Sequence, residues 1–119
     1  MLISHVDLRV TDRTRAEAFY APLLAMLGSD SRRTEDWTTF ALPADRDVHW
    51  FGFTEDPGMT PNAARIAFTA ASREIVDRVA EQLPKLGART IEGPDTSEGY
   101  YAVFFEDPDG NRLEVCVPE

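Results

Sequence analysis

The sequence predicts an α+β fold made of two copies of one module, in which a strand and a helix are followed by three further strands. The same order of elements occurs on both sides of segment 54–62, which holds two prolines and a glycine in nine residues and is typical of a linker. In addition, His5-Val6-Asp7-Leu8 matches Arg65-Ile66-Ala67-Phe68 at an offset of 60 residues. We therefore expect a single domain, 1–119, with modules at 1–53 and 63–119.

In the first module, residues 2–10 alternate in character, which predicts a strand with one apolar and one polar face. The polar face carries His5, Asp7 and Arg9. We expect Asp7 to form an ion pair with Arg9, with substrate contact as the alternative. The stretch 14–17, Thr-Arg-Ala-Glu, has the form of a capping box that opens a helix ending at Gly28. Further strands are expected at 29–34, 36–42 and 48–53.

In the second module, a strand is expected at 64–69, followed by a helix that Ser72 caps and Gly87 ends. Three strands follow, at 88–92, 101–106 and 112–117. The last two are joined by a tight turn at 107–111, because Pro108 presets φ and Gly110 allows a positive φ. The polar stretch 92–99 is expected to be a loop that acts as a mobile lid.

Composition and charge exclude several classes of function. The formal net charge of -9 and a pI near 4.6 would repel a nucleic-acid backbone. We therefore expect no nucleic-acid partner. No apolar run approaches the roughly 20 residues that span a bilayer, and no N-terminal signal-like segment is present, so we expect a cytoplasmic protein without a membrane partner. The single cysteine, Cys116, is interpreted as a small buried apolar residue.

Two side chains are candidate catalytic groups. Glu114 lies on a strand predicted to be well buried, where a carboxylate requires a partner. His5 can transfer a proton near neutral pH. Of Tyr100 and Tyr101, which follow Gly99, one is expected to direct its hydroxyl to the same side of the sheet as these groups, because adjacent strand residues face opposite ways.

Four stretches resemble the vicinal oxygen chelate superfamily, the group of glyoxalases, bleomycin-resistance proteins and extradiol dioxygenases. They are His-Val-Asp-Leu-Arg-Val-Thr-Asp at 5–12, Ala-Phe-Tyr-Ala-Pro-Leu-Leu at 18–24, Arg-Ile-Ala-Phe at 65–68 and the long block from Gly99 to Val115. The resemblance implies two βαβββ modules that form a cupped, incomplete mixed β-barrel with the helices outside. It further implies a small-molecule or metal site inside the cup, and a homodimer.

Members of this superfamily that use a metal take its ligands from the first and last strand of each module. The resemblance places His5 and Glu114 at two of these positions and Arg65 at a third, where histidine is usual. The fourth falls on Phe51 or His49, depending on whether Leu113-Glu114-Val115 aligns with Trp50-Phe51-Gly52 or with Val48-His49-Trp50. Because arginine stays protonated, it cannot ligate a metal, and we expect Arg65 to pair with Glu114.

Three functions follow from the resemblance. The first is a small-molecule-binding protein with an altered metal site and no cofactor, with or without catalytic activity. The second is a divalent-metal-dependent lyase, isomerase or dioxygenase that holds Fe, Mn, Ni or Zn through His5, His49 and Glu114. The third is an antibiotic-sequestering protein of the bleomycin-resistance type, for which the acidic charge suits a cationic drug. The candidate ligand contacts are Asp7, His49, Phe51, Arg65, Tyr100 and Tyr101.

Overall fold

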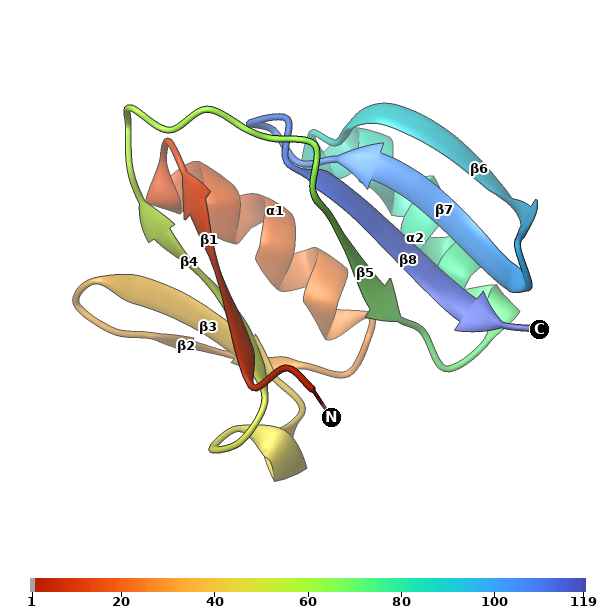
Figure 1. Cartoon of the computed structure of the whole chain (residues 1–119), viewed down its shortest axis with the longest axis horizontal. Coiled ribbons are helices and arrows are strands. Elements are labelled where there is room, and N and C mark those ends of the chain that lie inside the picture. Colours follow the sequence, from red (N-terminus) through yellow and green to blue (C-terminus); the bar gives the residue numbers. More distant parts are fainter. Residues whose placement is uncertain (1) are drawn as a thin grey trace. The chain divides into compact units, whose positions relative to one another are not determined.

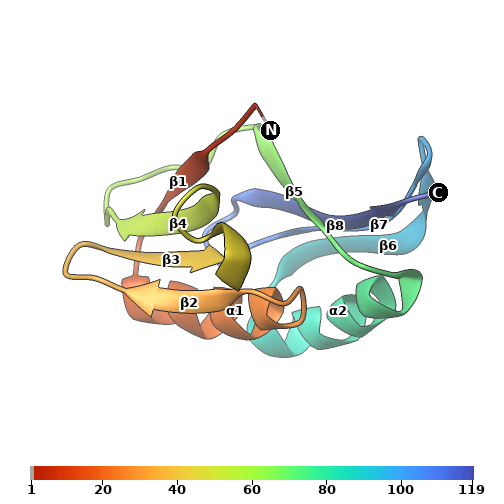
Figure 2. The same cartoon turned by 90° about the horizontal axis from the view of Figure 1, so that it is seen from below.

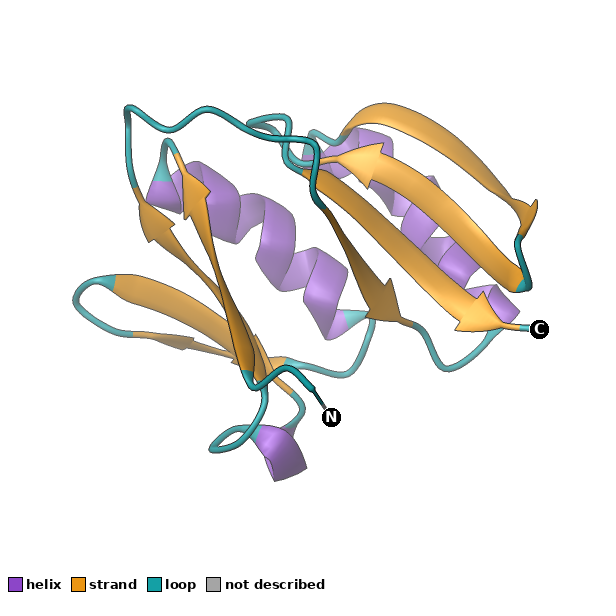
Figure 3. Ribbon diagram, viewed as in Figure 1, coloured by secondary structure: helices purple, strands orange, loops and turns teal. Residues whose placement is uncertain are grey.

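The computed structural model describes residues 2–119, in two compact units that divide at Met59 and Thr60 (Figures 1 and 3). Residue 1, where the predicted first module begins, lies outside the described residues. The first unit contains β1 (His5–Val10), α1 (Arg13–Ala25), β2 (Asp30–Arg33), β3 (Trp37–Ala41), the 3-10 helix η1 (Pro43–Asp45) and β4 (Trp50–Glu55). The second contains β5 (Arg65–Thr69), α2 (Arg73–Leu86), β6 (Arg89–Ser97), β7 (Tyr100–Glu106) and β8 (Arg112–Pro118). The predicted α+β fold of βαβββ modules is confirmed.

Each unit is one four-stranded mixed sheet with a helix on one of its faces (Figure 2). The strand order is β1-β4-β3-β2 in the first sheet and β5-β8-β7-β6 in the second. The β1–β4 and β5–β8 pairs are parallel, and the other pairs are antiparallel. The apolar side chains of alternate strand positions pack under the helix. Phe53 lies against Tyr20 in the first unit, and Leu83 and Leu113 are fully buried in the second. Polar strand residues are therefore left on the opposite face of each sheet.

The two helices begin in different ways. Ser72 Oγ accepts a hydrogen bond from the Ile75 amide, and Gly87 ends α2 with a φ of 94°, as predicted. The predicted capping box at Thr14 is wrong. Asp12 caps α1 instead, because its carboxylate accepts from the Arg15 amide at 3.0 Å and the helix then begins at Arg13. No helix within residues 2–119 has both the length and the apolar character needed to cross a membrane.

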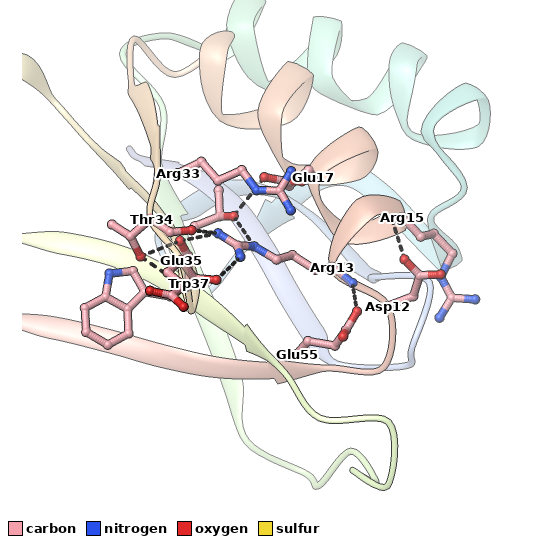
Figure 4. A network of polar contacts seen from close by, with 10 residues as sticks. Asp12, Arg13, Arg15, Glu17, Arg33, Thr34, Glu35, Trp37 and Glu55 are labelled. Atoms are coloured by element: carbon pink, nitrogen blue, oxygen red, sulfur yellow. Dashed lines mark hydrogen bonds and ion pairs between the residues drawn. The ribbon is translucent and has the colours of Figure 1, made fainter.

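Arg13 is buried at the start of α1 and ties this helix to β3 (Figure 4). Its guanidinium donates to the carbonyl oxygens of Glu35 at 2.8 Å, Thr34 at 2.5 Å and Trp37 at 2.6 Å. It also donates to Thr38 Oγ1 at 3.1 Å, and the Thr38 hydroxyl in turn donates to Glu17. A buried arginine is tolerated when nearly every donor has an acceptor. This network is a structural support of the first unit.

The hairpin at 107–111 is confirmed, and a buried carboxylate organises it. Asp107 is 1% exposed, and its Oδ1 accepts from the amides of Asp109 and Asn111, both at 2.9 Å. Its Oδ2 accepts from the Asn111 side-chain amide at 2.8 Å. Gly110 has a φ of 93°, in the region that favours glycine. The turn therefore fixes the register of β7 against β8.

The predicted lid at 92–99 is wrong, because β6 continues to Ser97 and pairs with β7 along its length. Only Glu98 and Gly99 form the turn between the two strands. The register of β6 shifts between Arg89 and Glu92 and again before Asp95. Most side chains of β6 are exposed, as expected for the edge of a sheet. An exposed edge strand can have the polar composition of a loop, which explains the error.

Candidate functional site

The polar face of the first sheet carries His5 and Asp7, and both contact side chains of the same sheet. The His5 ring stacks on Trp50 with centroids 4.3 Å apart and planes inclined by 8°. The Asp7 carboxylate accepts a hydrogen bond from Thr54 Oγ1 at 3.0 Å and lies 3.4 Å from Arg9. The expected Asp7–Arg9 pair is confirmed. Because Arg9 is half-exposed and the pair is screened by water, its contribution to stability is small.

The strand registers correct the position predicted to correspond to Glu114. In the second sheet Glu114 lies opposite Ala67, whereas in the first sheet Gly52 lies opposite Asp7. Because Asp7 and Ala67 are equivalent at the offset of 60 residues, Gly52 is the counterpart of Glu114. Both registers proposed from the sequence are wrong, and neither Phe51 nor His49 occupies this position. The repeat itself indicates that the loops of the two modules differ in length, because an offset of 60 residues would match Glu114 to Thr54. The strand registers replace Thr54 with Gly52.

The alternative ligand candidates lie elsewhere in the first unit. Phe51 is 8% exposed, and its ring centroid is 5.3 Å from that of Tyr20 on α1, so it belongs to the core. His49 precedes β4, and its amide donates to the carbonyl oxygen of Asp45 at 2.7 Å. The structure therefore does not bring Phe51 to the polar face that carries His5.

The polar face of the second sheet carries Arg65, Arg112 and Glu114. Arg65 and Arg112 are register partners on β5 and β8. The guanidinium carbon of Arg65 lies 4.8 Å from the ring centroid of Phe104, which is a cation–π contact. The predicted Arg65–Glu114 ion pair is wrong, because no salt bridge joins these two side chains within residues 2–119. The register places Arg65 opposite Arg112 rather than opposite the carboxylate.

Glu114 is half-buried, and it interacts with the thiol of Cys116, two positions along the same strand. Cys116 is 7% exposed, as the sequence predicts. Burial raises the pKa of the Cys116 thiol, and the Glu114 carboxylate raises the pKa further through its charge and a hydrogen bond. The thiol is therefore held in its unreactive protonated form.

The two adjacent tyrosines face opposite sides of the second sheet. Tyr101 turns toward α2, where its hydroxyl donates to Asp77 at 2.5 Å and Arg73 lies 4.2 Å from its ring centroid. The hydrogen bond to Asp77, together with burial and the negative charge of Asp77, raises the pKa of Tyr101. Tyr100 is 44% exposed on the side of the sheet that Glu114 also occupies. Of the two, Tyr100 is the one available to a ligand on that face.

A hollow of about 250 Å³ opens on the second sheet, beside the Arg65–Phe104 contact. Of its lining residues, only Arg65 was a candidate from the sequence. Alternation along β7 and β8 could have indicated that Phe104 and Glu106 share a face with Glu114 and Arg112, but the part played by β6 depends on its irregular register. The lining residues are Arg65, Thr90, Glu92, Phe104, Phe105, Glu106 and Arg112.

Comparison with known proteins identifies the family. The model of the Glyoxalase/Bleomycin resistance protein/Dioxygenase superfamily matches residues 2–115. The chain belongs to this superfamily. It is 29% identical to the uncharacterized protein YqjT of Bacillus subtilis strain 168, over 96% of this chain and 97% of that protein.

Solved structures of the superfamily have the same fold. A glyoxalase/bleomycin resistance protein from Albidiferax ferrireducens is 26% identical, with full coverage of both chains and a TM-score of 0.85. The fosfomycin resistance protein FosX from Listeria monocytogenes is 22% identical, covers 100% of this chain and 94% of its own, and has a TM-score of 0.72. The similarity to FosX concerns the fold alone.

The residues of this superfamily member do not fit the metal site expected from the resemblance. The four positions on the first and last strands of the two modules hold His5, Gly52, Arg65 and Glu114. Glycine supplies no side-chain ligand, and arginine supplies a permanent positive charge. Within residues 2–119, no group of three or more histidine, cysteine, aspartate or glutamate side chains is arranged to hold a metal ion. Two of the four positions therefore supply no metal ligand.

Proposed function

We propose that this superfamily member is a small-molecule-binding protein that works without a divalent metal. The observation that supports the proposal most strongly is the position of Arg65. It stands on β5 where metal-using relatives carry histidine, and its guanidinium is held against Phe104. A fixed positive charge repels a metal cation and attracts an anionic or oxygen-rich ligand.

The roles of the other candidates follow from their chemistry. His5 is the side chain suited to proton transfer if the protein is also catalytic, because imidazole exchanges protons near neutral pH. Its stacking on Trp50 fixes the plane of the ring. Glu114 offers a half-buried acceptor on the second sheet, and the exposed Tyr100 offers a hydroxyl on the same face.

Metal analysis tests this proposal. The protein is produced in medium containing Mn, Fe, Ni and Zn, purified without chelator, and its metal content is measured by mass spectrometry beside the His5→Ala variant. We expect far less than one metal ion per chain in both proteins. Stoichiometric divalent metal in the wild type that is lost in His5→Ala would contradict the proposal and favour the alternative of a metal-dependent lyase, isomerase or dioxygenase that uses His5, His49 and Glu114.

Antibiotic sequestration is the remaining candidate, and the net charge of -9 is the observation that favours it. Calorimetric titration with bleomycin, a cationic glycopeptide, at two salt concentrations tests it. Sequestration requires micromolar or tighter binding that weakens strongly with salt. We expect no such binding, because a hollow of about 250 Å³ is smaller than the roughly 300–1,000 Å³ typical of sites for drug-sized ligands.

We also propose that the protein is a homodimer. Membership in the superfamily supports this proposal. Sedimentation equilibrium at several protein concentrations gives the mass directly. A mass of twice the 13.3 kDa chain is the expected result, and a single 13.3 kDa species at every concentration would contradict it.

A further inference from the structure

We infer that the hollow on the second sheet binds the carboxylate or phosphoryl group of a small molecule, with Arg65 and Arg112 as the anion-binding pair. The inference rests on the proposed function, because it names the ligand class of a binding protein that needs no metal. It is argued from the second unit alone.

The first observation is that two positively charged side chains lie opposite each other and neither has an anionic partner among the described residues. Arg65 and Arg112 are register partners on adjacent parallel strands, which lie about 4.8 Å apart. Like charges at directly opposite positions destabilise a sheet. Neither guanidinium forms a hydrogen bond or ion pair with another residue of the described chain, 2–119. A bound oxyanion would remove the repulsion and use the vacant donors.

The nearby carboxylates do not neutralise the pair. Glu106 lies opposite Arg112 on β7, but its carboxylate is 3.8 Å from Arg89, on the other neighbouring strand. Glu114 lies two positions along β8 from Arg112, between Ala67 and Phe104. The two arginines therefore remain available to a ligand.

The second observation is that Phe104 positions Arg65 for recognition. The ring lies 4.8 Å from the guanidinium carbon and contacts it through a cation–π interaction. This contact restricts a long side chain and uses none of its N–H donors. A planar guanidinium held in this way can bind a carboxylate or a phosphoryl group through two parallel hydrogen bonds. Less side-chain entropy is then lost when the ligand binds.

The third observation is the irregular backbone that forms one wall of the hollow. The register of β6 shifts between Arg89 and Glu92, and Thr90 has a φ of 52°. A β-branched residue in the left-handed region is unusual, and such residues cluster at functional sites. Bulges redirect side chains beside binding sites. Here the irregular segment places Thr90 and Glu92 at the edge of the hollow.

The remaining lining residues limit the ligand further. Glu92 and Glu106 would repel a second anionic group and would accept hydrogen bonds from a hydroxyl or an amine. The volume of about 250 Å³ suits a compact molecule. The expected ligand therefore carries one oxyanion and at least one hydroxyl or amino group.

The test is a titration of the full chain with small molecules in buffer that contains excess EDTA. Binding is detected as shifts of backbone amide signals in the NMR spectrum. The probes are 3-hydroxybenzoate for a carboxylate and glycerol 3-phosphate for a phosphoryl group, and the neutral control is 3-hydroxybenzamide. We expect at least one anion to shift the amides of Arg65, Phe104 and Arg112 saturably. Arg112→Gln should weaken binding about tenfold or more, whereas Arg32→Gln, which removes an exposed arginine of the first sheet, should leave it unchanged.

Preference for one of the two anions would assign the group that the site takes. The inference fails if neither anion shifts these amides, if Arg112→Gln binds as tightly as the wild type, or if the neutral amide binds as well as the benzoate. A second measurement does not require tight binding. Phosphate should raise the melting temperature of the wild type more than that of Arg112→Gln, which itself should melt no lower than the wild type in the absence of phosphate. A much lower melting temperature for the variant would contradict the repulsion argument.

The two proposals can fail separately. Stoichiometric metal in the purified protein would overturn the metal-independent function, while the EDTA titration would still decide the anion site. Conversely, a metal-free protein whose ligands shift only amides of the first unit would overturn the anion site alone.

Discussion

The Trp50 indole lies flat against the His5 imidazole on the first sheet, with ring centroids 4.3 Å apart. The same Trp50 ring approaches Gly52, the counterpart of Glu114, so that a Cβ atom built on this glycine would lie 3.1 Å from the ring. The first sheet therefore presents an aromatic stack at the position where the second sheet carries a carboxylate. This difference between the two sheets leads to the first prediction.

Gly52→Ala should lower the free energy of unfolding by about 1–3 kcal/mol, because a Cβ atom would lie 2.9 Å from the Thr38 carbonyl oxygen as well as close to Trp50. Urea denaturation measures the change. The matched control is Gly58→Ala, where the nearest atom would be 3.7 Å away and little loss is expected. Equal stability of the two variants would show that the Trp50 stack does not occupy this space.

Arg13→Met should destabilise the protein by about 3 kcal/mol, because it removes the guanidinium that donates to the carbonyl oxygens of Thr34 and Glu35. The Trp37 carbonyl oxygen keeps its hydrogen bonds from the amide and hydroxyl of Thr34. Chemical denaturation gives the value. Arg32→Met, at an exposed position, should change stability by no more than about 0.5 kcal/mol. If the two variants are equally stable, the buried network does not support the fold as described.

Cys116 should react slowly with iodoacetamide at pH 8, because burial and the Glu114 carboxylate raise the pKa of its thiol and reduce the thiolate fraction. Glu114→Gln should lower that pKa and speed the reaction, measured as alkylation rate against pH. Since the native state favours the protonated thiol, this contribution to stability is full below the unfolded pKa and is lost as the pH rises through the folded one. A pH–rate profile that does not move in Glu114→Gln would contradict the contact between the two residues.

Tyr101 should titrate above the usual range of a tyrosine, because its hydrogen bond to Asp77 raises the pKa of the phenol. Ultraviolet absorbance at increasing pH measures this value, and the difference between the wild type and Tyr101→Phe isolates the Tyr101 signal from those of Tyr20 and Tyr100. Asp77→Asn should lower the pKa toward its ordinary value. The stabilising contribution is complete below the unfolded pKa of about 10 and disappears at higher pH. An unchanged titration in Asp77→Asn would rule out this hydrogen bond.

Much of the fold could be predicted because local signals agree with one another. Alternation identified β1, and the repeat matched β5 to it. Ser72, Gly87 and Gly110 marked the ends of elements through their own backbone chemistry. Asp12 was missed because both it and Thr14 are suitable capping residues, and only the packing of Arg13 decides between them. The polar β6 was missed because its pairing with β7, rather than its composition, makes it a strand.

The candidate site was less predictable, because it depends on register and not on residue type. Gly52 could not be matched to Glu114 from the repeat, since the connection before β4 contains η1 and that before β8 is a tight turn. Arg65 was paired with the wrong partner because the parallel register of β5 and β8 places it opposite Arg112, and places Glu114 opposite Ala67. The hollow was missed because it depends on the shift of β6 around Thr90, a tertiary feature that no local sequence signal specifies.

The measurement that tests the central claim most directly is the affinity for 3-hydroxybenzoate with and without metal. Calorimetry is carried out on the purified protein in excess EDTA, and then after EDTA is replaced by Mn²⁺, Ni²⁺ or Zn²⁺. The titration is made with 3-hydroxybenzoate or, if the site prefers a phosphoryl group, with glycerol 3-phosphate. The account predicts the same dissociation constant in every case, and loss of binding in Arg65→Gln. Binding that requires one of these metals and disappears in His5→Ala would contradict it.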